Sequence, residues 1–272
     1  MITREELLKN PSQLYLKVFL NGTFGVGKTY TSMTSPKWAY AMIEPNGIMT
    51  AMVPANKHLL DNMVYYESFV PRQDEDLKVT FQRLSAFLAK VREDAKAGIV
   101  QTLILDNLSH LAENRWMYMD VHERGMYTTQ TGAINTLQMY GGLGRWLYKF
   151  ILMEVISVPA HVFVNCHLMD EEENVPGKSE QRQKTGRIIS NVLGGFRKDA
   201  PGLFNASLYL EKKSLAGEKY LYQAICQQTG TYPFAKNNVG LPSKVENVSY
   251  STLMGALGQA GSSGGATGGV TG

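Results

Sequence analysis

Short apolar runs alternate with longer segments of helical pattern along this chain. The apolar runs occupy Leu14–Leu20, Trp38–Ile43, Thr102–Asp106 and Ala160–Asn165. Continuous runs of this length are typical of parallel strands that are buried on both faces. Between them, Asp74–Ala97 has apolar residues at the spacing of a helix. The alternation predicts right-handed βαβ units and a mostly parallel central sheet flanked by helices, which is an α/β fold.

The remaining pattern is less regular. Residues 107–159 are mostly helical in pattern, with a polar, glycine-containing interruption at Arg124–Gly132. Asp170–Lys198 is polar and predicts a loop. Ser207–Glu211 and Tyr220–Ile225 predict a pair of antiparallel strands near the C-terminus.

Length and composition predict one globular domain. The chain has 272 residues, of which 44% are hydrophobic and 19% charged, and these values are ordinary for a soluble protein. We predict a single domain over residues 1–254, opening with a short helix that starts at a capping box over Thr3–Glu6 and ends by Pro11. Beyond Met254 the chain is rich in glycine and has no charge, so we predict a disordered tail over residues 255–272.

Charge and cysteine content exclude several classes of protein. The net charge of +3 is too small to indicate a nucleic-acid partner by itself. The two cysteines, Cys166 and Cys226, exclude a disulfide framework and a cysteine-rich zinc site. Lys149, Glu154 and Pro159 interrupt the most apolar region, and the polar N-terminus shows no signal peptide. We therefore expect a cytoplasmic protein with no membrane partner.

The turn after Leu14–Leu20 carries a phosphate-binding sequence. It reads Gly-Thr-Phe-Gly-Val-Gly-Lys-Thr, which matches G-x-x-x-x-G-K-T. Its glycines let the backbone approach an anion, and its amide groups converge at a helix N-terminus. Lys28 would contact the β- and γ-phosphates, and Thr29 offers a hydroxyl to Mg²⁺. We predict nucleotide binding by Gly22, Thr23, Phe24, Gly25, Val26, Gly27, Lys28, Thr29 and Tyr30.

Further polar residues end the other apolar runs, where parallel strands meet one edge of the sheet. Asp106 is suited to hold Mg²⁺, and Glu44 is suited to orient the attacking water. Asn165 and His167 are suited to contact the γ-phosphate. The residue after Asp106 is Asn107, so an adjacent Asp-Glu pair is absent. The residues alone leave open that Glu44 is an exposed turn carboxylate and that His167 is structural.

Two segments have the composition of a nucleic-acid surface. Aromatic and basic residues interleave from Arg115 to Arg145, and residues 176–198 hold six basic residues against the single acid Glu180. We interpret the acidic run Asp170–Glu173 as a solvated face. Core aromatics and an ordinary solvated loop are the alternatives. The predicted contacts are Arg115, Arg124, Lys178, Arg182, Lys184 and Arg187.

Four segments in this order, GTFGVGKT, WAYAMIEPNG, TLILDNLSHL and HVFVNCHL, resemble the RecA-like core ATPases encoded by phages. These include recombinase-related single-strand annealing ATPases, and the resemblance covers about residues 12–245. It implies a RecA-like P-loop fold that binds ATP and Mg²⁺ and self-associates with nucleotide at subunit interfaces. It also implies that Glu44 is the catalytic base, that Asp106 binds magnesium, and that loops at about 115–135 and 170–195 face DNA.

The resemblance extends to two further positions. Lys236 is the basic residue placed to reach a neighbour's nucleotide. Cys166 stands where RecA-type recombinases usually have glutamine, and His167 is the candidate replacement.

We expect a Mg²⁺-dependent ATPase that binds single-stranded DNA in phage recombination, annealing or replication, in the host cytoplasm. A phage replication or single-strand-binding protein is a further candidate partner. One alternative is an ATP-driven switch or motor that acts on a phage protein, such as a helicase or packaging component. A non-hydrolysing nucleotide-binding scaffold and a small-molecule kinase with a lid at 178–198 are the others.

Overall fold

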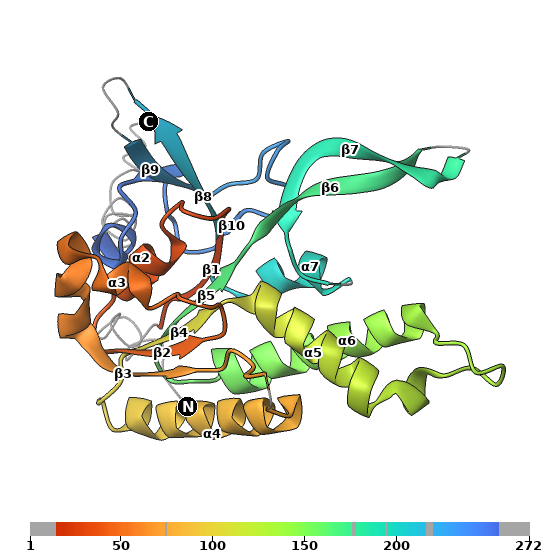
Figure 1. Ribbon diagram of the computed structural model, residues 1–272. Helices are drawn as coiled ribbons and strands as arrows, with labels where there is room; N and C mark the ends of the chain where they lie inside the picture. The colour runs from red at the N-terminus through yellow and green to blue at the C-terminus, as the bar shows by residue number, and fades with distance from the viewer. Residues whose placement is uncertain (1–14, 74, 176–177, 194, 216–219, 256–272) are drawn as a thin grey trace, which may run out of the picture.

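The computed structural model describes residues 15–73, 75–175, 178–193, 195–215 and 220–255, and Figure 1 shows their arrangement. The predicted N-terminal helix lies outside these residues, and so does the predicted tail apart from Gly255. Within the described ranges, no helix is long and apolar enough to cross a membrane.

A nine-stranded sheet forms the centre of the molecule (Figure 1). Its main path runs β11-β9-β8-β1-β5-β4-β2-β3, and β10 pairs with β8. The six strands from β8 to β3 are parallel, whereas β9, β10 and β11 pair antiparallel. The strands of this sheet are β1 (Lys17–Asn21), β2 (Trp38–Met42), β3 (Met63–Ser68), β4 (Thr102–Asp106), β5 (His161–Cys166), β8 (Ala206–Ser214), β9 (Tyr220–Ile225), β10 (Lys236–Asn237) and β11 (Lys244–Glu246). The predicted fold class is confirmed.

The interior positions of the central strands are almost all apolar because both faces of the sheet are covered. β1, β2 and β4 are buried at every position. On one face, Phe19, Leu103 and Val164 pack with residues of three long helices. On the other face, Trp38 and Ile104 pack with residues of the shorter helices near the phosphate loop. Helix packing on both faces explains why these strands show no alternation of apolar and polar residues.

The helices begin and end close to the sequence signals. Asp76 caps α4 by accepting a hydrogen bond from Lys78 N, and Gly98 beyond its end has a φ of 71°. The predicted interruption after α5 is also present, as a short 3₁₀ turn at Arg124–Tyr127. The labelled α-helices are α2 (Lys28–Met33), α3 (Met49–Met52), α4 (Leu77–Lys96), α5 (Leu108–His122), α6 (Thr136–Phe150) and α7 (Phe196–Asp199), and residues 250–255 are also helical. Further 3₁₀ turns cover Pro54–Asn62 and Ala200–Leu203, and α6 continues as a π-helical segment over Ile151–Ile156.

The predicted loop at 170–195 is wrong, because most of this stretch is a long hairpin. Strands β6 (Leu168–Val175) and β7 (Lys178–Ser190) pair antiparallel and extend away from the central sheet (Figure 1). Glu172 of β6 lies opposite Lys184 of β7, which also contacts Asp170, and Arg187 Nε contacts Glu171 Oε2 at 2.7 Å. Opposite charges across a strand pair stabilise it without an apolar face. The apolar alternation that signals a strand is therefore missing from the sequence.

Candidate active site

The phosphate loop connects the buried end of β1 to the start of α2. Gly25 and Gly27 have φ angles of 74° and 93°, which residues with side chains rarely adopt. A Cβ at Gly22 would lie 2.5 Å from Val26 Cγ2, so this position also requires glycine. The backbone N of Gly22 donates to Cys166 O at 3.1 Å, which joins the loop to β5. The loop therefore has the backbone geometry that its glycine positions predict.

Lys28 lies at the start of α2 with its ammonium group folded over the loop. Its Nζ donates to the carbonyl oxygens of Gly22 and Thr23, both at 2.8 Å, and lies 3.4 Å from His167 Nδ1. Burial lowers the pKa of Lys28, although the carboxylates of Asp106 and Glu44 oppose this effect. The ammonium group is therefore positioned beside the loop amides, where a phosphate would replace its carbonyl partners.

Asp106 is buried at the end of β4 and faces Thr29. Its Oδ2 accepts hydrogen bonds from Thr29 Oγ1 at 2.7 Å and from Tyr40 OH at 2.9 Å. Its Oδ1 has no hydrogen-bond partner among the residues that the structure describes. Burial raises the pKa of Asp106, partly offset by the Thr29 bond, and the charge of Glu44 raises it further. Tyr40 was not predicted from the sequence, where it resembles any other apolar residue of β2.

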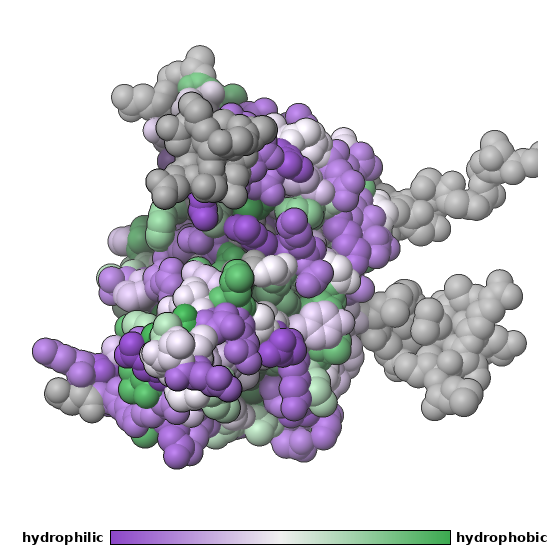
Figure 2. All heavy atoms as spheres, turned by 90° about the vertical axis from the view of Figure 1, so that its right-hand side faces the viewer, coloured by the Kyte–Doolittle hydropathy of each residue, from purple (hydrophilic) through white to green (hydrophobic). Residues whose placement is uncertain are grey.

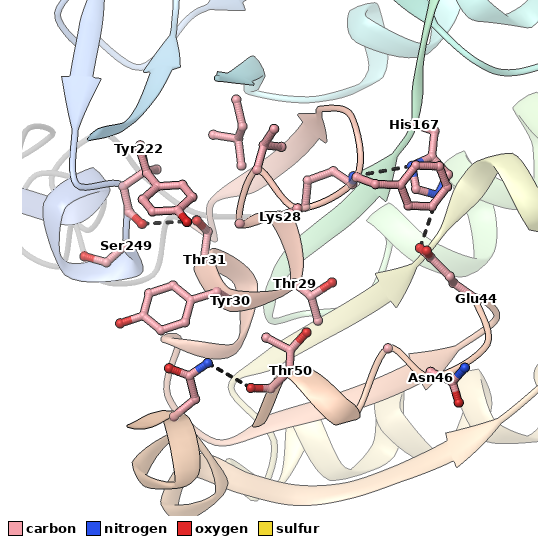
Figure 3. Close-up of a pocket in the computed structure, with 18 of the residues that line it drawn as sticks. Lys28, Thr29, Tyr30, Thr31, Glu44, Asn46, Thr50, His167, Tyr222 and Ser249 are labelled. Atoms are coloured by element: carbon pink, nitrogen blue, oxygen red, sulfur yellow. Dashed lines mark hydrogen bonds and ion pairs between the residues drawn. The ribbon is translucent and has the colours of Figure 1, made fainter. Parts of the chain in front are cut away.

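Glu44 and His167 meet next to Lys28, as Figure 3 shows. His167 Nε2 lies 3.3 Å from Glu44 Oε2. Burial would raise the pKa of Glu44, but its contacts with His167 and Asn107 and the charge of Lys28 outweigh this effect and lower it. The ring of Phe24 packs against His167 with centroids 4.1 Å apart. Glu44 is therefore held ionised, which a general base requires.

Asn107 connects these side chains, and sequence reasoning missed this role. Its Nδ2 donates to Glu44 Oε2 and lies 2.8 Å from His167 Nε2. Its Oδ1 caps α5 by accepting from His110 N at 2.9 Å. An asparagine between an apolar strand and a helix is the ordinary signature of a helix cap. That signal was available in the sequence, but it does not reveal the contacts with Glu44 and His167.

A cavity of about 790 Å³ extends from this cluster along α2. Figure 3 shows Glu44 and His167 at one side and Tyr222 and Ser249 at the other. Tyr222 lies on β9, and Ser249 lies close to the C-terminal end of the described residues. No sequence signal identifies these lining residues, because they come from segments about 200 residues beyond the phosphate loop.

Asn165 and Lys236 were predicted to act at the site but do not line the cavity. Asn165 is fully buried, and its Nδ2 donates to Ser32 Oγ at 3.3 Å behind α2. Only His167 of the predicted pair lines the cavity, and the γ-phosphate contact of Asn165 stays a prediction. Lys236 Nζ donates to the carbonyls of Gly202 and Phe204, both at 2.9 Å. Its predicted contact with a neighbour's nucleotide stays a prediction.

Arg115 is packed inside the molecule, which corrects its assignment to a nucleic-acid surface. Its side chain is 11% exposed and pairs with Glu123 at 2.8 Å. Its guanidinium group also lies over the rings of Tyr118 and Trp146. A basic residue among aromatics in sequence is equally consistent with such packing, because arginine stacks on aromatic faces.

The other predicted nucleic-acid residues lie on the surface or on the hairpin. Arg124 is exposed on the turn after α5. Lys178, Arg182, Lys184 and Arg187 all lie on β7, and Lys184 contacts Asp170 of β6. Hydrophilic residues cover most of the face toward which the hairpin extends (Figure 2). The acidic run lies on the paired strand β6, and Asp170, Glu172 and Glu173 are exposed there, in agreement with the predicted solvated face.

Sequence comparison identifies one family. A model of the family described as AAA domain matches residues 14–237. None of the curated proteins matches this chain in sequence.

Two solved structures are similar to this chain at low identity. One is a prototypical ATPase from the type III secretion system of pathogenic bacteria, with a TM-score of 0.43 and 11% identity over 72% of this chain. The chain spans about half of that protein, 51% of its length. The other is a KaiC-like protein from the hyperthermophilic archaeon Pyrococcus horikoshii OT3, with a TM-score of 0.36 and 11% identity, covering 77% of this chain and 78% of that one.

Proposed function

The chain belongs to the AAA domain family, and on this premise we propose that it is a magnesium-dependent ATPase whose catalytic base is Glu44. One observation carries the proposal: His167 lies 3.3 Å from Glu44 Oε2 and 3.4 Å from Lys28 Nζ, beside the phosphate loop. A phosphate loop alone only binds an anion. A carboxylate base on the γ-phosphate side is what hydrolysis requires in addition.

The oxygen atoms around Thr29 fit Mg²⁺. Asp106 Oδ1 is a buried oxygen without a partner in the described part of the chain, and Oδ2 accepts from the Thr29 hydroxyl. Hard oxygen ligands of this kind suit Mg²⁺, which keeps several of its own waters. When bound, the ion would neutralise charge on the phosphate oxygens. Asp106 and Thr29 are the residues that would hold it.

The chain's own groups account for the remaining chemistry. The loop amides hold the phosphates, while Lys28 exchanges the carbonyls of Gly22 and Thr23 for phosphate oxygens. Glu44 accepts a proton from a water molecule as the water oxygen bonds to the γ-phosphorus and the bond to the bridging oxygen of ADP breaks. ADP and phosphate are released, and the proton passes from Glu44 to solvent. His167, between Lys28 and Glu44, is placed to hydrogen-bond the γ-phosphate.

The test is ATP turnover of Glu44→Gln, with Glu172→Gln on the exposed part of the hairpin as the matched control. Glu44→Gln should lower turnover by about 10²–10⁴-fold, the usual contribution of a general base, and should retain nucleotide binding. Glu172→Gln should turn over ATP like the parent. A Glu44→Gln variant as fast as the parent would contradict the proposal and favour a nucleotide-binding scaffold or a different base.

We also propose single-stranded DNA as the partner of this ATPase, in phage recombination, annealing or replication. Exposed basic residues on β7 and at Arg124 support this partner. The hairpin is also joined to the active site, since Ser190 Oγ donates to Asn21 Oδ1 and Asn191 N donates to His167 O, both at 2.7 Å. Turnover measured with and without single-stranded DNA at low salt tests it. Equal rates and no DNA retention would refute DNA as the partner.

A protein partner is the second candidate, and the charges of the hairpin favour it. Basic residues of β7 are opposed by acids of β6, as in the pairs Lys184–Asp170 and Arg187–Glu171. A surface with both positive and negative charges suits a protein with complementary charges better than it suits a phosphate backbone, which is only negative. The chain would then be an ATP-driven switch or motor for a phage protein such as a helicase, packaging component or single-strand-binding protein. Capture of one such protein without DNA retention would support this alternative.

Self-association with nucleotide between subunits is part of the proposal. Lys236 would exchange its contacts with the Gly202 and Phe204 carbonyls for a neighbour's nucleotide. Light scattering should show a larger assembly with ATP than without it. Lys236→Ala should lower turnover while each chain still binds nucleotide. A protein that turns over ATP as a monomer would contradict this arrangement.

A further inference from the structure

Three side chains beside the phosphate loop bring metal-binding atoms together. Glu44, His110 and His167 each offer one ligand atom, and these atoms all lie within 4.8 Å of one another. We propose that this cluster is a second metal site, separate from the Thr29–Asp106 pair, which binds a transition-metal ion such as Zn²⁺ and thereby removes Glu44 from catalysis. The inhibitory part rests on the proposed ATPase function, whereas metal binding does not.

The ligand set selects the kind of ion. Two imidazole nitrogens and one carboxylate oxygen suit Zn²⁺ and leave a fourth position for water or phosphate. Mg²⁺ prefers oxygen ligands, such as those of Thr29 and Asp106. Millimolar Mg²⁺ should therefore fill that site without competing for the histidine cluster.

Two of the three ligand atoms already have the spacing of a metal site. His167 Nε2 lies 3.3 Å from Glu44 Oε2. Two ligands that each bond a tetrahedral Zn²⁺ at about 2.0–2.1 Å are separated by roughly 3.3 Å. An ion could bind both atoms without movement of β5 or of the turn that follows β2.

Asn107 brings the ligand atoms of Glu44 and His167 to one amide group. Its Nδ2 donates to Glu44 Oε2 and lies 2.8 Å from His167 Nε2. An imidazole binds a metal ion through a nitrogen that carries no proton, so an ion bound at Nε2 requires the tautomer with its proton on Nδ1. The ion would take the place of the Asn107 amide as the positive partner of the Glu44 carboxylate.

His110 supplies the third ligand from the first turn of α5. Its Nδ1 lies 3.1 Å from Asn107 Oδ1, and its ring centroid is 5.7 Å from that of His167. The residue is only half-buried, so its side chain can turn toward the ion. The positive charge of Lys28, 3.4 Å from His167 Nδ1, opposes the ion, and the carboxylate of Glu44 offsets it.

Zinc binding is measured by competition with a chromophoric chelator, in millimolar Mg²⁺ and without nucleotide. His110→Ala should weaken binding at least about tenfold, the lower end of what second-shell changes cost at metal sites. His110→Gln, which keeps a polar side chain beside Asn107, should weaken it similarly, with the circular dichroism of the parent. His58→Ala, an exposed histidine outside the cluster, should bind zinc like the parent. Parent-like affinity in both His110 variants would overturn the proposal.

The inhibition is measured separately, as ATP turnover at fixed Mg²⁺ with added Zn²⁺, each variant relative to its own zinc-free rate. The parent and His58→Ala should lose activity over the range in which they bind zinc. His110→Ala should require at least about tenfold more zinc. Equal zinc sensitivity in parent and His110→Ala would refute inhibition through this site. Because the chelator competition needs no ATP, a chain without turnover would refute the ATPase and leave the zinc result unaffected.

Discussion

The two ends of the central sheet both bury ionisable side chains, but they satisfy them differently. At the amino ends of the strands, Lys17 donates to the carbonyls of Val158 and Ala160, both at 2.6 Å, and both ring nitrogens of His161 have partners. At the carboxyl ends, Asp106 Oδ1 has no partner within the described residues. Burying an unpaired polar atom costs stability. For Asp106, this cost falls at the end of the sheet where a ligand is proposed to bind.

Two equally buried lysines show the same contrast. Lys17 and Lys28 are 9% and 6% exposed, and each donates to two carbonyls. The partners of Lys17 belong to a segment about 140 residues away, so its bonds join distant parts of the fold. The partners of Lys28 belong to its own phosphate loop, beside the cavity. Burial alone therefore does not identify a functional lysine; the identity of its partners does.

Among the variants that test this contrast, Asp106→Asn should have the largest effect. Turnover should fall about 100-fold or more, because a metal ligand worth several kcal/mol is weakened. Burial raises the pKa of Asp106, so the native state binds protons more tightly than the unfolded chain and loses stability as pH rises above the ordinary carboxyl range. At pH 7 the neutral asparagine should therefore raise the melting temperature without ligand. Calorimetry that shows a lower melting temperature would contradict the contrast between the two ends.

Lys17→Met should lower stability without changing turnover, in contrast to Asp106→Asn. Its loss removes donors from buried carbonyls, so the free energy of unfolding should fall by about 1–3 kcal/mol. ATP turnover of the folded protein should be unchanged, because Lys17 lies at the other end of the sheet. Urea unfolding and a turnover assay measure the two quantities. A Lys17→Met variant that is as stable as the parent but turns over ATP more slowly would contradict a purely structural role for the amino ends of the strands.

His161 should give the stability of the molecule a specific pH dependence. Its pKa is lowered to about 4, first by burial and then by the charge of Lys17. An unfolded imidazole titrates near 6.5, so the native state binds fewer protons between these values. The free energy of unfolding should therefore fall as pH falls from about 6.5 to about 4. His161→Asn keeps an acceptor for Leu16 N and should reduce the difference in urea-unfolding free energy between pH 7 and pH 5. An unchanged difference would assign the pH dependence to other groups.

The smallest expected effect is that of Tyr40→Phe, which removes one donor from Asp106 Oδ2. The free energy of unfolding should fall by about 0.5–1.5 kcal/mol. The same substitution in an Asp106→Asn background should cost less, because the bond to a charged acceptor is the stronger one. A double-mutant cycle measures this difference. If Tyr40→Phe lowers the free energy of unfolding equally in both backgrounds, the Tyr40 hydroxyl makes no charge-assisted bond to Asp106.

Much of the fold and part of the site could be predicted from the sequence. The four buried strands and α4 lie close to the predicted ranges, because both faces of the sheet are covered and the apolar pattern reports that burial. The phosphate loop was predicted because its glycines and Lys28 act through local backbone geometry. Glu44 and Asp106 were predicted because parallel strands end at a common edge.

Other features depended on contacts between distant segments. The hairpin β6–β7 was missed because its stabilising charges pair only across the two strands. Arg115 was misassigned because its aromatic neighbours lie on both α5 and α6.

The sequence by itself determined a phosphate loop, a parallel sheet and the carboxylates at its edge, since these follow from local conformation and from which segments are buried. Only the tertiary structure decided that Asn165 lies behind α2, that His167 reaches Glu44, and that Asn107 joins them. These side chains come from strand ends about 60 residues apart or more along the chain. The direction in which each one points is set by the packing of β2, β4 and β5 side by side, which no local pattern records.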